Sequence, residues 1–252
     1  MSTYVCSDFH GCLHFYKEIK KILKSEDKVF FLGDAGDRGP HCWETIKAIL
    51  DDPQFIYIRG NHEDMLIRAL EGYLYDGLSE YRDMHMLSIN GGGPTYEEAI
   101  ADPKVNDYYK KLIKLPLLKE YFNPEGKRFL LSHAGFTPWK EEFFADDEEK
   151  RDVVFTRPSP RELVWNRDHF FDVWDEQDCV DCYIIHGHTP IPYLLDDIDP
   201  ACKMGEIEPG ALWYDNDRKC CVDCGAVFTG ICVLLNLDTL EEEIFISDPY
   251  IS

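Results

Sequence analysis

Five short apolar runs of this chain each end in a cluster of carboxylate, amide or imidazole side chains. Runs of this length predict buried strands, and ligands of open α/β sheets bind outside the carboxyl ends of the strands. Oxygen and nitrogen donors that recur at strand ends therefore predict one shared site for two divalent metals. The clusters are Asp8-Phe9-His10, Gly33-Asp34-Ala35-Gly36-Asp37-Arg38-Gly39, Arg59-Gly60-Asn61-His62-Glu63, His133 and His186-Gly187-His188.

The first part of the chain alternates these strands with amphipathic segments of helical period. This is the order of a parallel sheet covered by helices. Residues 71–114 predict further helices, with a capping box formed by Thr95 and Glu98. We expect three strands: one that ends near residue 7, one over 28–32 and one over 54–58. We expect three helices, over 13–24, from about 40 to 50, and over 61–70.

The later part of the chain predicts a different strand pairing. A hairpin is expected over 120–132, around a turn signal. Antiparallel strands are expected over 212–214, 219–222, 229–236 and 243–246, with a turn at 215–217. Residues 139–181 are expected to form an irregular surface excursion.

The chain has no linker rich in glycine, proline or serine, so we expect residues 1–252 to form one domain. The expected fold class is α/β: a two-sheet sandwich flanked by helices, in which a parallel half packs on an antiparallel half.

The formal net charge of −22 argues against general nucleic-acid binding, because such a surface repels phosphate backbones. The same negative charge repels a phosphorylated substrate, so a site that binds such a substrate needs strong local positive charge. The N-terminus shows no signal peptide, and no apolar run is long enough to span a bilayer. We therefore expect a cytoplasmic monomer with no membrane partner.

Ten cysteines in a chain of this length are expected to be free, buried thiols. Two matching tetrapeptides, Cys179-Val180-Asp181-Cys182 and Cys221-Val222-Asp223-Cys224, could instead hold a structural zinc. Core packing is the favoured interpretation, because the second tetrapeptide lies in an apolar run.

The donor types at the strand ends indicate which metals they suit. Asp8 and His10 combine a carboxylate with an imidazole, which suits Mn, Fe or Zn better than Mg or Ca. Asp34 has two oxygens that could bridge two metals. Together with an amide oxygen and two further imidazoles, the candidate ligands are Asp8, His10, Asp34, Asn61, His133 and His188.

These clusters resemble the signature motifs of the PPP-type metallophosphoesterases, a family that includes serine/threonine phosphoprotein phosphatases and symmetrical diadenosine tetraphosphatases. The resemblance runs from about residue 4 to residue 240. The motifs are Asp8-Phe9-His10-Gly11, Gly33-Asp34 with Asp37-Arg38-Gly39, Gly60-Asn61-His62-Glu63, Ser132-His133-Ala134-Gly135 and Gly187-His188-Thr189-Pro190. Segments resembling the bacterial branch are Asn90-Gly91-Gly92 with Thr95, Trp165-Asn166-Arg167, and Asp223-Cys224-Gly225-Ala226. Between Asp34 and Asp37 this chain has Ala35-Gly36, where members of the family often have two bulky residues.

The resemblance implies a role for each metal ligand. Asp8 and His10 hold one metal, and Asp34 bridges to a second. Asn61, His133 and His188 complete the second site. Two divalent ions are implied, with Mn²⁺ favoured and Fe, Zn, Ni or Co as alternatives.

The other motif residues are expected to act on the substrate. His62 is the candidate general acid, and Asp37 would orient and charge it. Arg38 and Arg167 would neutralise phosphate oxygens. A structural ion pair between Asp37 and Arg38 is an alternative. Glu63 is interpreted as a residue of a first helical turn, favoured by the helix dipole, rather than as a partner of the site.

We therefore expect a dinuclear metal-dependent phosphoesterase acting on phosphate monoesters, foremost a serine/threonine phosphoprotein phosphatase. The alternative is a hydrolase of symmetrical dinucleoside tetraphosphates, because the same metal core serves both. A non-catalytic module would have lost a ligand, His62 or Arg38, and all are present. A cysteine-based redox or zinc protein would require the two CxxC pairs to converge.

Overall fold

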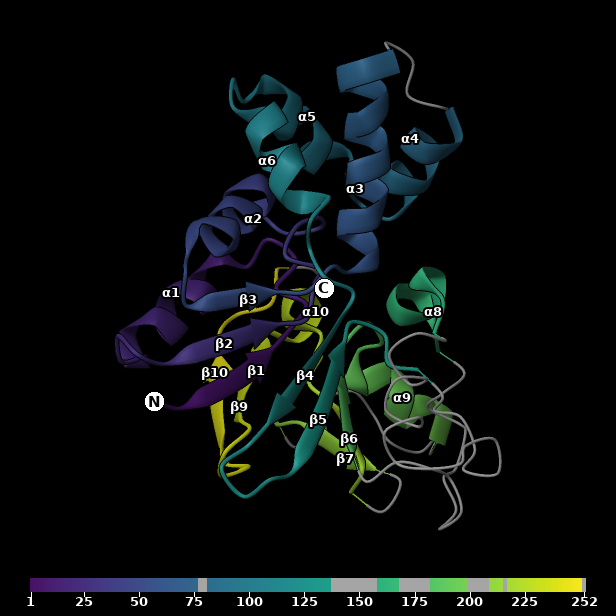
Figure 1. The fold of residues 1–252 in the computed structure, drawn as a ribbon. Helices are drawn as coiled ribbons and strands as arrows, with labels where there is room; N and C mark the ends of the chain where they lie inside the picture. The colour runs from purple at the N-terminus through teal and green to yellow at the C-terminus, as the bar shows by residue number, and fades with distance from the viewer. Residues whose placement is uncertain (77–80, 137–157, 168–181, 199–208, 215–216, 251–252) are drawn as a thin grey trace, which may run out of the picture.

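Two five-stranded sheets form the centre of the molecule (Figure 1). The computed structural model describes residues 1–76, 81–136, 158–167, 182–198, 209–214 and 217–250. The first sheet has the strand order β10-β9-β1-β2-β3, and the second has the order β4-β5-β6-β8-β7. Residues 215–216 of the predicted turn and most of the predicted excursion at 139–181 lie outside the described residues.

The first sheet joins the beginning of the chain to its end. Its strands β1, β2 and β3 run parallel, β9 pairs antiparallel with β1, and β10 pairs antiparallel with β9. The strands are β1 (Thr3–Cys6), β2 (Lys28–Phe31), β3 (Phe55–Tyr57), β9 (Ile231–Asn236) and β10 (Glu242–Ile246).

The second sheet is also mixed. Strands β5, β6 and β8 run parallel, with β4 and β7 antiparallel at the two edges. The hairpin predicted over 120–132 is confirmed as β4 and β5. The strands are β4 (Leu118–Phe122), β5 (Arg128–Ser132), β6 (Tyr183–His186), β7 (Leu212–Tyr214) and β8 (Lys219–Cys221).

The two-sheet α/β sandwich is confirmed, but its predicted division into a parallel and an antiparallel half is wrong. The two C-terminal strands β9 and β10 complete the first sheet, whereas β7 and β8 complete the second. Strand β8 also pairs parallel with β6. Local patterns identified the strands, but which strands pair is decided by long-range burial that a single sequence does not display.

Helices cover the outer faces of the sandwich and gather at one end of it (Figure 1). The prediction that residues 71–114 are mostly helical is confirmed for the described part of this segment. The helical elements are α1 (Leu13–Ile22), α2 (Cys42–Asp51), α3 (Asn61–Glu71), the π-helical turn η1 (Gly72–Asp76), α4 (Tyr81–Ile89), α5 (Gly93–Ala101), α6 (Val105–Leu112), α8 (Pro160–Trp165), α9 (Ile191–Ile198) and α10 (Ala226–Thr229).

The described residues form three apolar clusters, one between the sheets and the others on their outer faces. Successive residues of one strand enter different clusters, because side chains alternate across a sheet. Val5 packs between the sheets with Leu131 of the second sheet. Cys6 packs with helix residues such as Ile46 on the outer face of the first sheet. Leu163 of α8 packs with Leu130 and Ile184 on the outer face of the second sheet.

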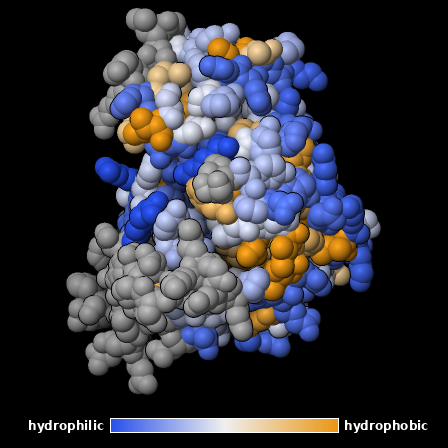
Figure 2. Space-filling view, turned by 180° about the vertical axis from the view of Figure 1, so that it is seen from behind, coloured by the Kyte–Doolittle hydropathy of each residue, from blue (hydrophilic) through white to orange (hydrophobic). Residues whose placement is uncertain are grey.

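The outer surface is largely polar on the face seen in Figure 2, with hydrophobic side chains in limited areas. Ile244 and Ile246, on the edge strand β10, are among the exposed large hydrophobic residues. Among the described helices, none is long and apolar enough to cross a bilayer.

Candidate active site

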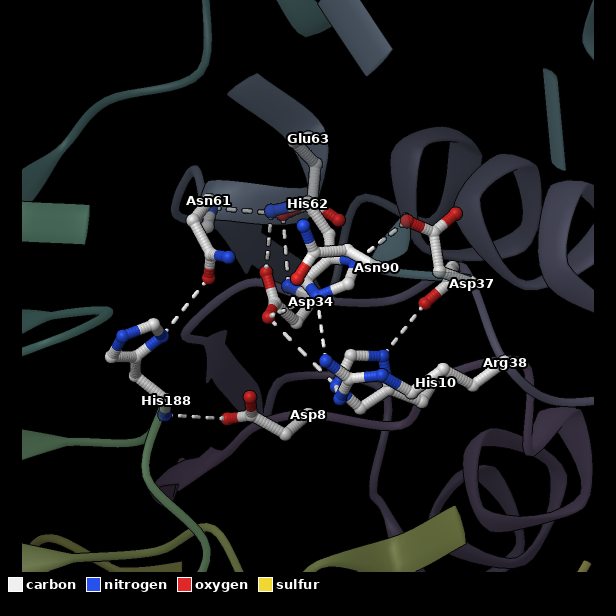
Figure 3. A network of polar contacts seen from close by, with 12 residues as sticks. Asp8, His10, Asp34, Asp37, Arg38, Asn61, His62, Glu63, Asn90 and His188 are labelled. Carbon is white, nitrogen blue, oxygen red and sulfur yellow. Dashed lines mark hydrogen bonds and ion pairs between the residues drawn. The ribbon is translucent and has the colours of Figure 1, made fainter. Parts of the chain in front are cut away.

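The predicted strand-end side chains meet where the two sheets come together. Asp34 lies at the centre of the labelled side chains, with Asn61 and His188 on one side and His10, Asp37 and Arg38 on the other (Figure 3). Five strands deliver these side chains, since Asp8 follows β1, Asp34 follows β2, Asn61 follows β3, His133 follows β5 and His188 follows β6. The predicted convergence of residues far apart in the sequence is therefore confirmed.

Unusual backbone geometry aims these side chains. Non-glycine residues seldom adopt positive φ, and such residues concentrate at functional sites. The strand β2 leaves the sheet through Gly33, whose φ is 99°, and a Cβ there would lie 2.5 Å from the backbone nitrogen of Gly60. Only glycine allows the loops after β2 and β3 to approach so closely. Six site residues have positive φ: Asp8, His10, Asp34, Asp37, Arg38 and His188.

One side of Asp34 holds an amide and two imidazoles. Asn61 Oδ1 lies 2.8 Å from His133 Nε2 and 3.0 Å from His188 Nδ1. Asp34 Oδ2 lies 3.4 Å from the same His133 nitrogen. Nδ1 of His133 donates to the carbonyl of Leu32 at 2.7 Å, which directs Nε2 toward the site. Ligand atoms of Asp34, His133 and His188 lie within 4.8 Å of one another.

The other side of Asp34 holds two more imidazoles. Asp34 Oδ2 lies 3.8 Å from Nε2 of both His10 and His62. Nδ1 of His10 donates to the Gly36 carbonyl at 2.9 Å, which leaves its Nε2 lone pair directed into the site. Arg38 reaches both rings, with Nη1 at 2.6 Å from His10 Nε2 and Nη2 at 3.0 Å from His62 Nε2.

Asp8 lies on the His188 side of the centre. Its Oδ2 accepts a hydrogen bond from the His188 backbone N–H at 3.2 Å. The structure groups His62, rather than Asp8, with His10 and Asp34 in one set of closely spaced ligand atoms. Burial, and the nearby charge of Asp223, raise the pKa of Asp8 well above its ordinary value.

This donor set fits divalent cations. Asp8 Oδ1 and His188 Nε2 are buried and have no hydrogen-bond partner among the described residues. A buried polar atom without a hydrogen-bond partner destabilises the fold unless another group, such as a bound ion, interacts with it. Burial would raise the pKa of Asp34, but the imidazoles of His133 and His62 hold it well below its usual range. Several imidazoles combined with carboxylates suit Mn, Fe, Zn or similar ions.

The His62 ring is held in place by Asp37. Its Nδ1 lies 2.5 Å from Asp37 Oδ2, and the other Asp37 oxygen accepts a hydrogen bond from the Thr95 hydroxyl. Burial alone would lower the pKa of His62, but the charge of Asp34 and the hydrogen bond to Asp37 outweigh it and raise the pKa. In the described part of the chain, Asp37 thus binds His62 and Thr95 rather than Arg38.

One local interpretation of the sequence is wrong. Thr95 does not cap a helix with Glu98: α5 begins at Gly93 after a Gly92 N-cap, and the Thr95 hydroxyl binds Asp37 instead. Helix propensity gave no hint of this partner, because Asp37 lies 58 residues away in the sequence.

Glu63 lies in the first turn of α3, as predicted, but it is also a fully buried anchor of the site. Its two oxygens accept hydrogen bonds from the backbone N–H groups of Asp34, Ala35 and Gly60 and from the Tyr57 hydroxyl, at 2.7 to 3.0 Å. A glutamate three residues after the N-cap is a capping signal, which could have identified part of this role.

Arg167 and His186 lie at the margin of the centre. Arg167 is exposed just after α8. Burial, then the charge of His133 and more weakly that of Arg167, lower the pKa of His188. His186 is buried, and its Nε2 lies 2.7 Å from the Tyr214 hydroxyl, which fits the predicted packing role.

The described cysteines of the two CxxC tetrapeptides pack in the core. Cys182 belongs to the cluster beneath α8, whereas Cys221 and Cys224 belong to the cluster between the sheets. Cys179 lies outside the described residues. Among the described residues, the groups that could hold a metal contain no cysteine.

Comparisons with known proteins show the family of this chain. The model of the calcineurin-like phosphoesterase family matches residues 1–224. The chain is 25% identical over 240 residues to the bis(5'-nucleosyl)-tetraphosphatase PrpE [asymmetrical] of Oceanobacillus iheyensis, covering 81% of this chain and 86% of that protein. It is 24% identical over 256 residues to the symmetrical bis(5'-nucleosyl)-tetraphosphatase of Photobacterium profundum, covering 90% of this chain and 83% of that protein.

Solved structures share the fold. A metallophosphoesterase from Sphaerobacter thermophilus superposes with a TM-score of 0.55 at 12% identity, covering 99% of this chain and 88% of that one. A serine/threonine phosphatase from Saccharomyces cerevisiae with similarity to human PP5 gives a TM-score of 0.52 at 15% identity, covering 98% and 80%. At these identities the likeness concerns the fold alone.

Proposed function

Because the chain belongs to the calcineurin-like phosphoesterase family, and is thus a metal-dependent phosphoric ester hydrolase, we propose that it hydrolyses dinucleoside tetraphosphates. The observation that carries the catalytic part is the convergence of carboxylate, amide and imidazole groups on Asp34. The substrate class is supported by the relatives named as bis(5'-nucleosyl)-tetraphosphatases, which align with most of the chain.

The proposed centre contains two divalent ions. Asp8, His10 and Asp34 would hold one ion, and Asp34 would share the second with the remaining three ligands, which are Asn61, His133 and His188. We propose Mn²⁺, although the donor set also suits Fe, Zn, Ni or Co. Ions bound there supply Lewis acidity, which lowers the pKa of bound water and neutralises phosphate charge.

The side chains of the protein supply orientation and proton transfer. Arg38, with both terminal nitrogens directed into the centre, would bind the equatorial oxygens of the attacked phosphate. Arg167 would add a second guanidinium from the end of α8. His62, held by Asp37 and with a raised pKa, would donate its proton to the leaving oxygen.

A phosphoserine or phosphothreonine protein, which the sequence alone favours, is the second candidate substrate. The observation in its favour is the buried His62–Asp37 pair. An alkoxide leaving group needs a proton more than a nucleotide phosphate does, so an acid of this kind suits monoesters well.

A substrate panel with added Mn²⁺ separates the two candidates. It compares diadenosine tetraphosphate, a phosphothreonine peptide and adenosine monophosphate by kcat/KM. We expect the dinucleotide to be the best substrate. A phosphopeptide turned over with the higher kcat/KM would overturn the proposal in favour of the second candidate.

A further inference from the structure

A cavity of about 480 Å³ lies between helices α3, α4 and α8. The α3 and α4 walls include Asp64, Arg68 and Met86, and the α8 wall includes Arg161 and Trp165. Cavities of this size hold small organic ligands, such as a nucleoside phosphate. None of the proposed metal ligands lines it.

The cavity nevertheless adjoins the metal-ligand cluster. Arg59, which lines it, comes two residues before Asn61. On the opposite wall, the Trp165 ring meets the His188 ring edge-on, with centroids 6.0 Å apart. A substrate held at the cluster could therefore extend into the cavity.

Arginines give the cavity a local positive charge within an acidic protein. Arg59, Arg68 and Arg161 line it, against the two carboxylates of Asp64 and Asp83. Asp64 lies 3.5 Å from Arg59 Nη1 and 3.0 Å from Arg68 Nη2, so one carboxylate serves two guanidiniums. Arg59 Nε is buried and has no hydrogen-bond partner among the described residues. Guanidinium groups that line a cavity suit the oxygens of a phosphate chain.

The remaining wall is apolar, which an inorganic anion would not require. Its side chains are Met65, Met86, Leu117, Val164 and Trp165. Apolar walls with an aromatic ring and a few cationic groups match a flat base joined to phosphates.

We propose that this cavity is the subsite for the nucleoside phosphate that extends beyond the attacked phosphorus. Its arginines bind the distal phosphates, and its apolar wall receives the base. The assignment of this ligand as part of a substrate rests on the proposed function. Binding of a nucleoside diphosphate does not, and it can be measured separately.

The test removes the two exposed guanidiniums and leaves Arg59 in place. The variant R68Q/R161Q is compared with the matched control K110Q/K114Q, which removes the same charge from exposed positions on or next to α6. Calorimetry measures the Kd of ADP and of inorganic phosphate with the Mn²⁺-loaded proteins. Kinetics measures the ratio of kcat/KM for diadenosine tetraphosphate to that for p-nitrophenyl phosphate.

For R68Q/R161Q we expect ADP to bind about tenfold more weakly and the kcat/KM ratio to fall about tenfold, which corresponds to loss of charge-assisted hydrogen bonds. K110Q/K114Q should change neither. Equal ADP affinity in both variants, or wild-type protein that binds phosphate as tightly as ADP, would overturn the subsite. Weakened ADP binding without any tetraphosphate hydrolysis by the wild type would refute the proposed substrate and support the subsite.

Discussion

The replacement Glu63→Gln tests whether a buried carboxylate builds the loop that carries Asp34. The side chain has no solvent exposure, and each of its two oxygens accepts two hydrogen bonds. In this variant an NH₂ group takes the place of one carboxylate oxygen. It then faces two groups that themselves donate hydrogen bonds and can no longer accept from them. Two hydrogen bonds to a charged group are therefore lost, at about 1.5 to 3 kcal/mol each.

The expected loss of stability is about 3 to 6 kcal/mol, a large part of the roughly 5 to 15 kcal/mol that holds a typical domain folded. For a chain of this size we expect the melting temperature to fall by roughly 10 °C. Because Glu63 holds the Asp34 backbone N–H, we also expect weaker metal binding.

Thermal unfolding followed by circular dichroism gives the stability change, and metal analysis after gel filtration gives the metal content. Glu97→Gln is the matched control, since Glu97 is exposed on α5 and its replacement should cost less than about 0.5 kcal/mol. Identical melting of the two variants, with equal metal content, would refute the anchoring role of Glu63.

Three further predictions concern other residues. Asp34→Asn should abolish hydrolysis of p-nitrophenyl phosphate and reduce bound metal, and unchanged hydrolysis would contradict the bridging role. His62→Asn should keep its metal but slow esters with poor leaving groups most, and equal losses across a leaving-group series would exclude an acid role. The Lys104 backbone N–H and the Lys47 ammonium lower the pKa of Asp102 from 3.8 to about 2, so this carboxylate stabilises the fold above pH 4 and loses that effect as the pH falls towards 2. Asp102→Asn should therefore cost about 1 to 2 kcal/mol at pH 7 and almost nothing at pH 2 in urea unfolding, and an equal cost at both pH values would contradict the linkage.

Local patterns predicted the strands and the convergence of their ends. The alternation of strands and helices in the first part of the chain requires parallel neighbours, and ligands collect at the carboxyl ends of such strands. Asp8, Asp34 and Asn61 could therefore be placed together from the sequence, although they follow different strands. That inference needed only the position of each residue along its strand.

Sheet membership and long-range hydrogen bonds could not be predicted in this way. Strand β9 pairs with β1, although the two strands lie near opposite ends of the sequence. No local sequence pattern identifies β1 as the partner of β9. Thr95 could be read as a helix cap because the Thr-x-x-Glu spacing is typical of one, whereas its hydroxyl binds Asp37. Glu63 likewise fits a first helical turn, and only tertiary structure brings its carboxylate to the Asp34 backbone.

Metal stoichiometry tests the central claim most directly. Wild-type protein is loaded with Mn²⁺, freed of excess ion, and analysed for manganese per chain while p-nitrophenyl phosphate hydrolysis is followed. We expect two ions per chain, with activity that rises as both are bound and disappears in chelator. Hydrolysis that persists in metal-free protein, or a single ion at full activity, would contradict the two-metal site centred on Asp34.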